Sequence, residues 1–190
     1  MVPELANPAQ RINRVQTETQ TLSEVRNPVQ YVWASARIGL GFIFFWAFID
    51  KLFGLGYTTP AARAWINGGN PTQGYLSSSF GPFADVFQAM AGHPVTNVLF
   101  MGGLLGVGLA LLLGMGVRIA GYSGAAMMLM MYLSHPIFAA SPHGTNPVMD
   151  DHIIYGLVLV ALAFVHAGRS IGLGAWWERQ PIVRRYPILE

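Results

Sequence analysis

Four long apolar segments dominate this 190-residue sequence and restrict what it can fold into. Each is about as long as the roughly 20 residues that a helix needs to cross a bilayer. Charged residues make up only 11% of the chain, less than half of the roughly 25% typical of soluble domains. We therefore predict an all-α fold, a bundle of four transmembrane helices with the lipid bilayer as a partner, over residues 32–53, 95–117, 119–140 and 149–168.

The sequence between and around these segments divides the chain into three parts. Residues 1–31 are polar and read as a cytoplasmic N-terminal arm, and residues 32–173 form the predicted membrane domain. Residues 174–190 combine tryptophan with arginine, which is typical of a segment at the membrane interface. The loop 54–94 is too long for a simple turn and carries helix signals at Thr59-Pro60 and Gly81-Pro82, so we expect short interfacial helices there.

Basic residues predict how the segments are oriented, because Lys and Arg beside a span are retained on the cytoplasmic side. Of the 11 basic residues, only Lys51 and Arg63 belong to the side of the long loop. All the others precede the first segment, open it, join the second to the third, or follow the fourth. We therefore predict that both termini are cytoplasmic and that the long loop lies outside.

Composition excludes several classes of function. The chain has no cysteine, which rules out thiolate metal sites, iron–sulfur clusters and covalently attached c-type haem. A net charge of +2, without a basic surface interleaved with aromatic residues, argues against nucleic acid as a partner. The first residues lack the apolar core and cleavage site of a signal peptide, so we expect the first segment to stay as an anchor.

Ionisable residues near the ends of the segments are the candidates for chemistry, because a charge inside a bilayer is costly. An outer layer contains the predicted catalytic candidates, together with Tyr132 and Asp150. Carboxylates that begin a helix also have an ordinary role as caps, and this alternative applies to Asp150 or Asp151. The candidates are Asp50, Lys51, His135, Asp151 and His152.

The two outer histidines raise the question of a haem or a metal. His135 and His152 could face each other as the two ligands of a haem, or bind a divalent metal together with a neighbouring aspartate. Their spacing matches no compact metal motif, and histidines at an aqueous boundary need no special explanation. We expect neither group.

An inner layer holds Arg37 in the first segment and His166 near the end of the fourth. Beside apolar walls, these two side chains could donate hydrogen bonds to the carbonyl oxygens of a quinone, and they are the candidates for binding that cofactor. The alternative is that Arg37 extends to lipid phosphate while His166 pairs with a backbone carbonyl.

Several stretches resemble a known family. Residues 36–53, with Ala36-Arg37-Ile38-Gly39 and Asp50-Lys51-Leu52-Phe53, are similar to the first span of DoxX/DoxD-like membrane proteins. The loop stretch 64–72, Gly81-Pro82-Phe83-Ala84 and the region from Asn146-Pro147 to Tyr155 resemble the DoxD branch. That branch is related to the membrane subunit of thiosulfate:quinone oxidoreductase.

The resemblance implies a four-helix subunit of a prokaryotic plasma membrane that takes part in the quinone-linked oxidation of thiosulfate or a similar small sulfur anion. It implies no secure set of catalytic residues. Other membrane subunits are expected partners. A noncatalytic accessory subunit of a larger respiratory complex is the alternative, and a small-molecule transporter is the third hypothesis.

Overall fold

The structure of the chain, a computed structural model, describes residues 28–135 and 148–190. These residues form eight α-helices and contain no strand, which confirms the predicted all-α class for the described part of the chain. The predicted arm up to residue 27 and the predicted end of the third segment, residues 136–140, lie outside the described residues.

Four long helices form where the apolar segments predict them: α2 (Pro28–Phe53), α5 (Pro94–Leu113), α6 (Val117–Ser134) and α7 (Asp151–Phe164). By length and composition, α2 and α5 are able to cross a membrane. The other two are shorter, with 18 residues in α6 and 14 in α7. At 1.5 Å per residue these correspond to about 27 and 21 Å.

Two of the predicted helix ends are wrong. The second segment stops being helical at Leu113 instead of residue 117, because Gly114 adopts a left-handed conformation with φ of 76° and closes the helix. The fourth helix ends at Phe164 instead of residue 168, where Val165 turns the backbone to an extended conformation. The apolar composition of the sequence by itself does not indicate where either helix ends.

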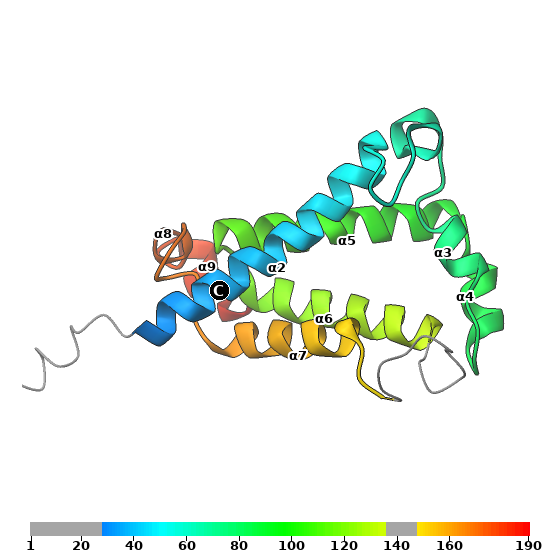
Figure 1. Cartoon of the computed structure of the whole chain (residues 1–190). Coiled ribbons are helices and arrows are strands. Elements are labelled where there is room, and N and C mark those ends of the chain that lie inside the picture. The colour runs from blue at the N-terminus through cyan, green and yellow to red at the C-terminus, as the bar shows by residue number, and fades with distance from the viewer. Residues whose placement is uncertain (1–27, 136–147) are drawn as a thin grey trace, which may run out of the picture.

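The long helices pack as two pairs, α2 with α5 and α6 with α7. Figure 1 shows the first pair above the second, joined by the short turn between α5 and α6. A single core connects the pairs and includes Phe44 of α2, Met101 and Leu104 of α5, Met128 of α6 and Leu159 of α7. Because α5 and α6 contact each other less extensively than the helices within each pair, the two pairs diverge toward one end.

We call that diverging end the loop end, because residues 54–93, the connection, cover it. The connection contains two 3-10 helices, η1 (Ala61–Arg63) and η2 (Trp65–Asn67), and the short helices α3 (Gln73–Ser77) and α4 (Ala84–Met90). The helix expected after Thr59-Pro60 is thus replaced by two 3-10 turns, whereas α4 follows Gly81-Pro82 as predicted.

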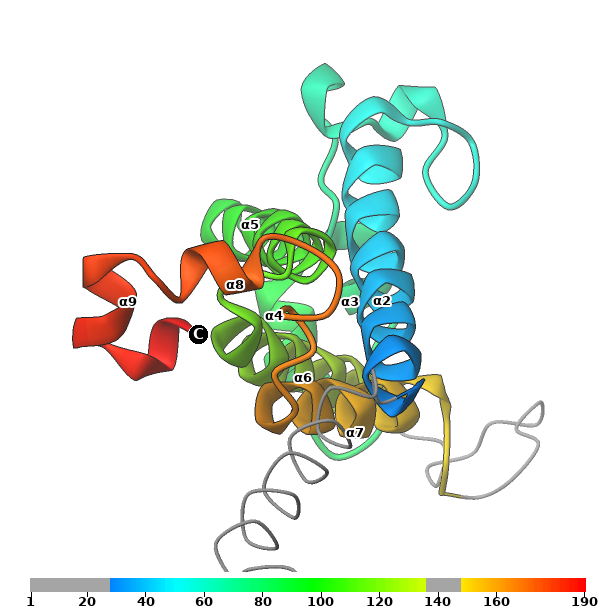
Figure 2. The same ribbon diagram turned by 90° about the vertical axis from the view of Figure 1, so that its left-hand side faces the viewer.

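The opposite end, the tail end, carries α8 (Gly174–Trp177), α9 (Pro181–Arg185) and η4 (Pro187–Leu189). Seen end-on in Figure 2, these elements lie across the ends of α5 and α6. The tail is attached by backbone contacts, since the amide of Arg118 at the start of α6 donates to the carbonyl of Glu190 over 2.9 Å.

Arg37 links three separate stretches at the tail end. Its side chain is fully buried, with 0% exposure, and its guanidinium donates hydrogen bonds to the carbonyl oxygens of Leu111 and Leu112 in the last turn of α5 and of Ile171 before α8. Carbonyls in a last helical turn have no partner within the helix, and a cation there also matches the negative end of the helix dipole. The alternative in which Arg37 reaches lipid phosphate is therefore wrong.

Glycine makes room for this contact. A Cβ atom on Gly114 would lie only 3.1 Å from Nη1 of Arg37, and Gly114 also has the positive φ that a residue with a side chain rarely adopts. Gly114 therefore ends α5 and also leaves space for the Arg37 guanidinium, which donates hydrogen bonds to the last carbonyl oxygens of α5.

We predict that Arg37→Ala destabilises the protein by about 3 kcal/mol, because buried carbonyl oxygens that lose their donors are costly. Thermal and denaturant unfolding in detergent would measure the loss. Arg184→Ala, which removes an exposed arginine of the same tail end, is the matched control. Equal effects of the two substitutions would contradict the assigned role of Arg37.

Candidate functional site

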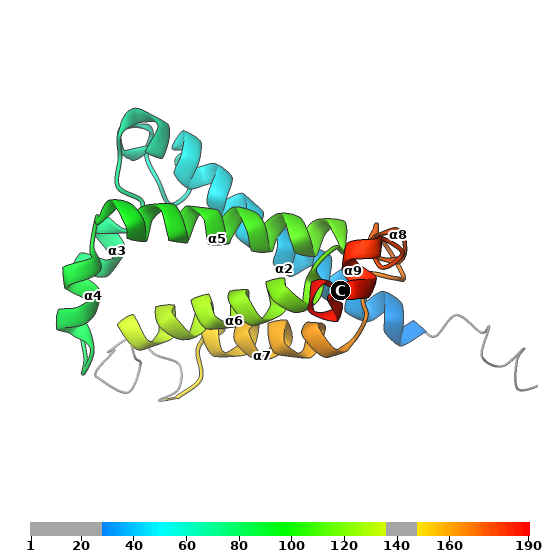
Figure 3. The same ribbon diagram turned by 180° about the vertical axis from the view of Figure 1, so that it is seen from behind.

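A cavity of about 1200 Å³ lies at the loop end of the bundle. It is bounded by the end of α2, the connection, the first turns of α5 and the last turns of α6. Figures 1 and 3 show α5 and α6 diverging toward this end, with α3 and α4 across it. The cavity thus occupies the space between the two helix pairs.

Part of the cavity lining is an apolar wall. Met127, Met130 and Met131 of α6 line it from one side, and Leu99 and Phe100 of α5 line it from the other. The methionine spacing of three and four residues places these side chains on one helical face. Because unbranched thioether side chains adapt to irregular shapes, this wall suits a flexible apolar ligand.

Gly103 of α5 lies next to Met127 of α6, which is one of the lining residues. A Cβ atom at Gly103 would lie 2.6 Å from Sδ of Met127, so the glycine leaves room there for the end of the methionine side chain. Toward the loop end from this contact the helices separate and the cavity begins.

Other lining residues are polar or positively charged. They include Lys51 of α2, Arg63 of η1 and the hydroxyl-bearing residues Thr59, Tyr75 and Ser134. Within the described part of the chain, no Asp or Glu side chain lines the cavity, and neither cation forms an ion pair. The lining therefore combines two cations with apolar side chains, and the Asp50 carboxylate next to Lys51 interacts electrostatically with it from outside the lining.

Asp50 has a structural position beside Lys51. Its carboxylate, which is 1% exposed, accepts hydrogen bonds from the amides of Tyr57 and Thr58 over 3.2 and 3.1 Å and from the Thr58 hydroxyl over 2.6 Å. These bonds hold the turn that follows α2. The carboxylate is thereby occupied, and Asp50 is not one of the residues that line the cavity.

A buried amide, Asn97 in the first turns of α5, attaches the rest of the connection. Its oxygen accepts from the amide and hydroxyl of Thr72 over 3.1 and 2.7 Å, and its nitrogen donates to the side chain of Asn70 over 3.0 Å. The Thr72 hydroxyl in turn accepts from the Gly92 amide over 3.2 Å. One side chain therefore anchors both ends of the segment that covers the cavity.

His135 joins the connection to the end of α6. The imidazole lies 3.3 Å from the hydroxyl of Ser78 and 3.1 Å from that of Ser134, and its ring packs against Tyr75 and Phe80 with centroid distances of 4.4 and 5.3 Å. Burial lowers the pKa of His135 and raises the pKa of the Tyr75 phenol. The histidine thus lies behind the cavity wall, next to the lining residues Tyr75 and Ser134.

The start of α7 behaves as a capped helix. Asp150 accepts hydrogen bonds from the Ile153 amide over 3.1 Å and contacts the imidazole of His152 at 2.8 Å, which confirms the predicted capping role of Asp150. Asp151 is exposed in the first turn. No group of three or more His, Asp or Glu residues that could hold a metal occurs in the described ranges.

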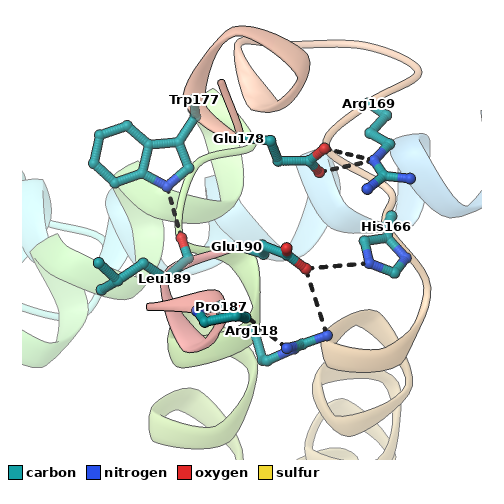
Figure 4. A network of polar contacts seen from close by, with 8 residues as sticks. All are labelled: Arg118, His166, Arg169, Trp177, Glu178, Pro187, Leu189 and Glu190. Atoms are coloured by element: carbon teal, nitrogen blue, oxygen red, sulfur yellow. Dashed lines mark hydrogen bonds and ion pairs between the residues drawn. The ribbon is translucent and has the colours of Figure 1, made fainter. Parts of the chain in front are cut away.

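His166 lies at the tail end, in the contact network of Figure 4. Its Nε2 is 3.4 Å from the Glu190 carboxylate, which also pairs with Arg118 at 3.7 Å. The nearby cavity of about 20 Å³ is too small for a quinone ring. Arg37 is occupied by carbonyl groups, so the structure shows no common quinone site for Arg37 and His166.

The predicted outer layer is therefore divided. Lys51 lines the cavity, Asp50 and His135 support its edges, and Asp151 and His152 lie outside the lining. Sequence reasoning missed the role of Asn97 and of the three methionines of α6 that line the cavity. The available signals were a polar side chain at the start of an apolar helix, for Asn97, and thioether side chains at helical spacing, for the methionines.

Replacing Asn97 by alanine is expected to release the connection, because Thr72 and Gly92 lose their shared anchor. We predict that hydrogen exchange at these two amides rises by about tenfold or more, as expected when a buried hydrogen bond worth 1.4 kcal/mol is lost. Asn67→Ala serves as the control, because it removes an exposed side-chain amide of η2 that donates to the carbonyl of Ala61 in the neighbouring η1. Unchanged exchange in Asn97→Ala would contradict the assigned anchor.

Comparison of the chain with known protein families, with curated proteins and with solved structures found no match. The family resemblance of the sequence thus stays a prediction, and the function is argued from the cavity itself.

Proposed function

We propose that this chain is a multi-pass membrane subunit whose four long helices cross the bilayer. The lengths and compositions of α2 and α5 support this, as do the large apolar side chains on outward faces of all four helices. Examples are Phe42 of α2, Leu99 of α5, Leu129 of α6 and Leu157 of α7, which are 53% exposed or more. Soluble monomers seldom expose contiguous apolar surface on this scale.

The distribution of charge supports a cytoplasmic tail end. Arg118, Arg169, Arg179, Arg184 and Arg185 all lie there, whereas the loop end has Lys51 and Arg63 as its cations within the described ranges. This arrangement follows the positive-inside rule and favours an orientation with the connection outside. That the membrane is a prokaryotic plasma membrane is what the family resemblance implies.

Because the chain has no cysteine, single cysteines can report this topology. We predict that Ala62→Cys in the connection reacts with a membrane-impermeant maleimide in intact cells, and that Ile188→Cys in the tail reacts only after the cells are permeabilised. Ala62 and Ile188 are both exposed, so the protein itself leaves both positions accessible to the reagent. Labelling of both sites in intact cells would contradict the proposed topology.

We further propose that the loop-end cavity supports the quinone-linked oxidation of thiosulfate or a similar small sulfur anion. The supporting observation is the charge of its lining, which among the described residues contains the cations Lys51 and Arg63 and no carboxylate. Such a surface attracts anions from the water side. The apolar wall of Leu99, Phe100 and the methionines would hold the quinone, with Lys51 and nearby hydroxyl groups as donors to its carbonyl oxygens.

The reaction balances with these two substrates. Two thiosulfate anions release two electrons when they join through a new sulfur–sulfur bond, and a quinone takes up two electrons and two protons when it becomes a quinol. The chain then has to hold the anions next to the quinone and stabilise the negative charge of the anions. Positioned cations in a partly enclosed site stabilise such charge well.

Neutralising the cations tests this function. With partner subunits present, Lys51→Gln and Arg63→Gln are expected to lower kcat/KM for thiosulfate-dependent quinone reduction by about tenfold or more each, because the anion loses an electrostatic partner. Arg184→Gln, which removes an arginine from the tail end, should leave the rate unchanged. Absence of any turnover by the wild-type protein would contradict the proposal and favour the accessory-subunit alternative.

A further inference from the structure

The tail has more positive than negative charge available on its surface. Residues 166–190 contain two acidic residues, and the network of Figure 4 uses both of them. Glu178 pairs with Arg169 over 2.7 Å, and Glu190 pairs with Arg118 over 3.7 Å. Three further arginines of the tail are exposed and form no ion pair with a described residue, namely Arg179, Arg184 and Arg185.

The helix α9 lies beside the bundle. Figure 2 looks along the long helices, and within the tail α9 extends furthest past the ends of α5 and α6, to the side away from α2. Figures 1 and 3 show it at the level where α5 ends and α6 begins. The carbonyls of Pro187 and Glu190, which accept hydrogen bonds from Arg118 over 3.1 and 2.9 Å, attach the tail to α6. In the proposed membrane, α9 therefore lies over lipid next to the helices.

One side of α9 combines a cation with apolar side chains. Ile182, Arg185 and Tyr186, which we call the tail surface, are three and four residues apart and so share one side of the helical turn. Ile182 is 55% and Tyr186 51% exposed, and neither lines a cavity described above. The guanidinium carbon of Arg185 lies 5.6 Å from the centroid of the Tyr186 ring. Arg184 lies about 200° around the helix from Ile182 and belongs to another side.

The chemistry of the tail surface suits a lipid headgroup. A guanidinium donates hydrogen bonds to two oxygens of a phosphate, while isoleucine and tyrosine are stabilised at the boundary between headgroups and acyl chains. The surplus positive charge adds attraction to a headgroup of net negative charge, which a zwitterionic headgroup lacks. A soluble acidic protein would match the charge but would not explain the place of α9 beside the bundle.

We infer that the tail surface binds anionic phospholipid from the leaflet on which it lies. Arg185 donates to the lipid phosphate, and Ile182 and Tyr186 contact the apolar boundary below it. The inference goes beyond the proposed reaction and depends only on the proposed membrane topology. It makes negatively charged lipid a partner of this chain at the end opposite the cavity.

Lipid occupancy can be measured directly at the tail surface. In the full chain, Ile182→Cys introduces a single thiol that carries a bimane fluorophore, which replaces one apolar side chain by another. The protein is reconstituted in phosphatidylcholine vesicles that contain a small, fixed fraction of lipid with a nitroxide on the acyl chain close to the glycerol. This quencher lipid is phosphatidylglycerol in one series and phosphatidylcholine in the other.

We expect labelled phosphatidylglycerol to have an affinity for the site about fivefold or more above that of labelled phosphatidylcholine, and Arg185→Gln to remove most of this preference. A basic residue near an anionic membrane contributes about 1 kcal/mol, which corresponds to the fivefold change. Arg184→Gln, the matched control, removes the same charge from another side of α9. It should leave most of the preference at physiological salt, which screens charges more than about 8 Å apart.

Glycerol phosphate added to the buffer distinguishes a free phosphate from a lipid, and it should not relieve the quenching. Relief by glycerol phosphate, equal quenching by the two lipids, or equal effects of Arg185→Gln and Arg184→Gln would each overturn the lipid site. Absence of quenching by either lipid would also overturn it and would favour an acidic protein as the partner. A monodisperse elution profile verifies that each variant is folded.

This test is separate from those of the proposed function. Both leaflets of the vesicles have the same composition, so the result does not depend on the direction in which the chain inserts. Orientation is tested by the labelling of Ala62→Cys and Ile188→Cys, and the reaction by thiosulfate-dependent turnover. Loss of lipid preference with correct labelling would overturn the lipid site alone.

Discussion

The buried guanidinium of Arg37 is the constraint on which the arrangement of the helices depends. A charge without water has to be surrounded by acceptors, and the acceptors it finds are carbonyl groups at the end of α5 and before α8. These bonds bring α2, α5 and the tail together at one end of the molecule. The two helix pairs are joined at this same end by the short turn between α5 and α6, and they diverge at the loop end, where the cavity lies.

At the loop end, polar side chains that could have competed for a ligand are used to hold the backbone. Asp50 fixes the turn after α2, Asn97 anchors the connection, and Asp150 caps α7. These contacts keep the Asp50 and Asp150 carboxylates out of the cavity lining, and they leave Lys51 and Arg63 without an ion-pair partner among the described residues. The lining is therefore positively charged for two reasons. Lys51 and Arg63 belong to it, and the Asp50 and Asp150 carboxylates are held outside it by their hydrogen bonds.

The candidate site shows how far sequence patterns reach. The end of the bundle was predictable for Asp50, Lys51 and His135, because alternating helix directions bring the C-terminal ends of α2 and α6 to the loop end. The direction of each side chain was not predictable, since adjacent residues such as Asp50 and Lys51 differ by about 100° around a helix and have different surroundings. His135 and His152 likewise belong to loop-end termini of their helices, yet one is bonded to the connection and the other to its own helix cap.

By itself, the sequence determined the all-α class, the positions of four apolar helices and the asymmetry of positive charge between the two ends. These properties depend on local composition and period, which a chain carries wherever it folds. Only the tertiary structure decided that Gly114 ends α5, that Arg37 is enclosed instead of reaching the surface, and that methionines and cations meet around one cavity. Such features depend on contacts between residues far apart in the chain, and no local pattern encodes the direction in which helices diverge.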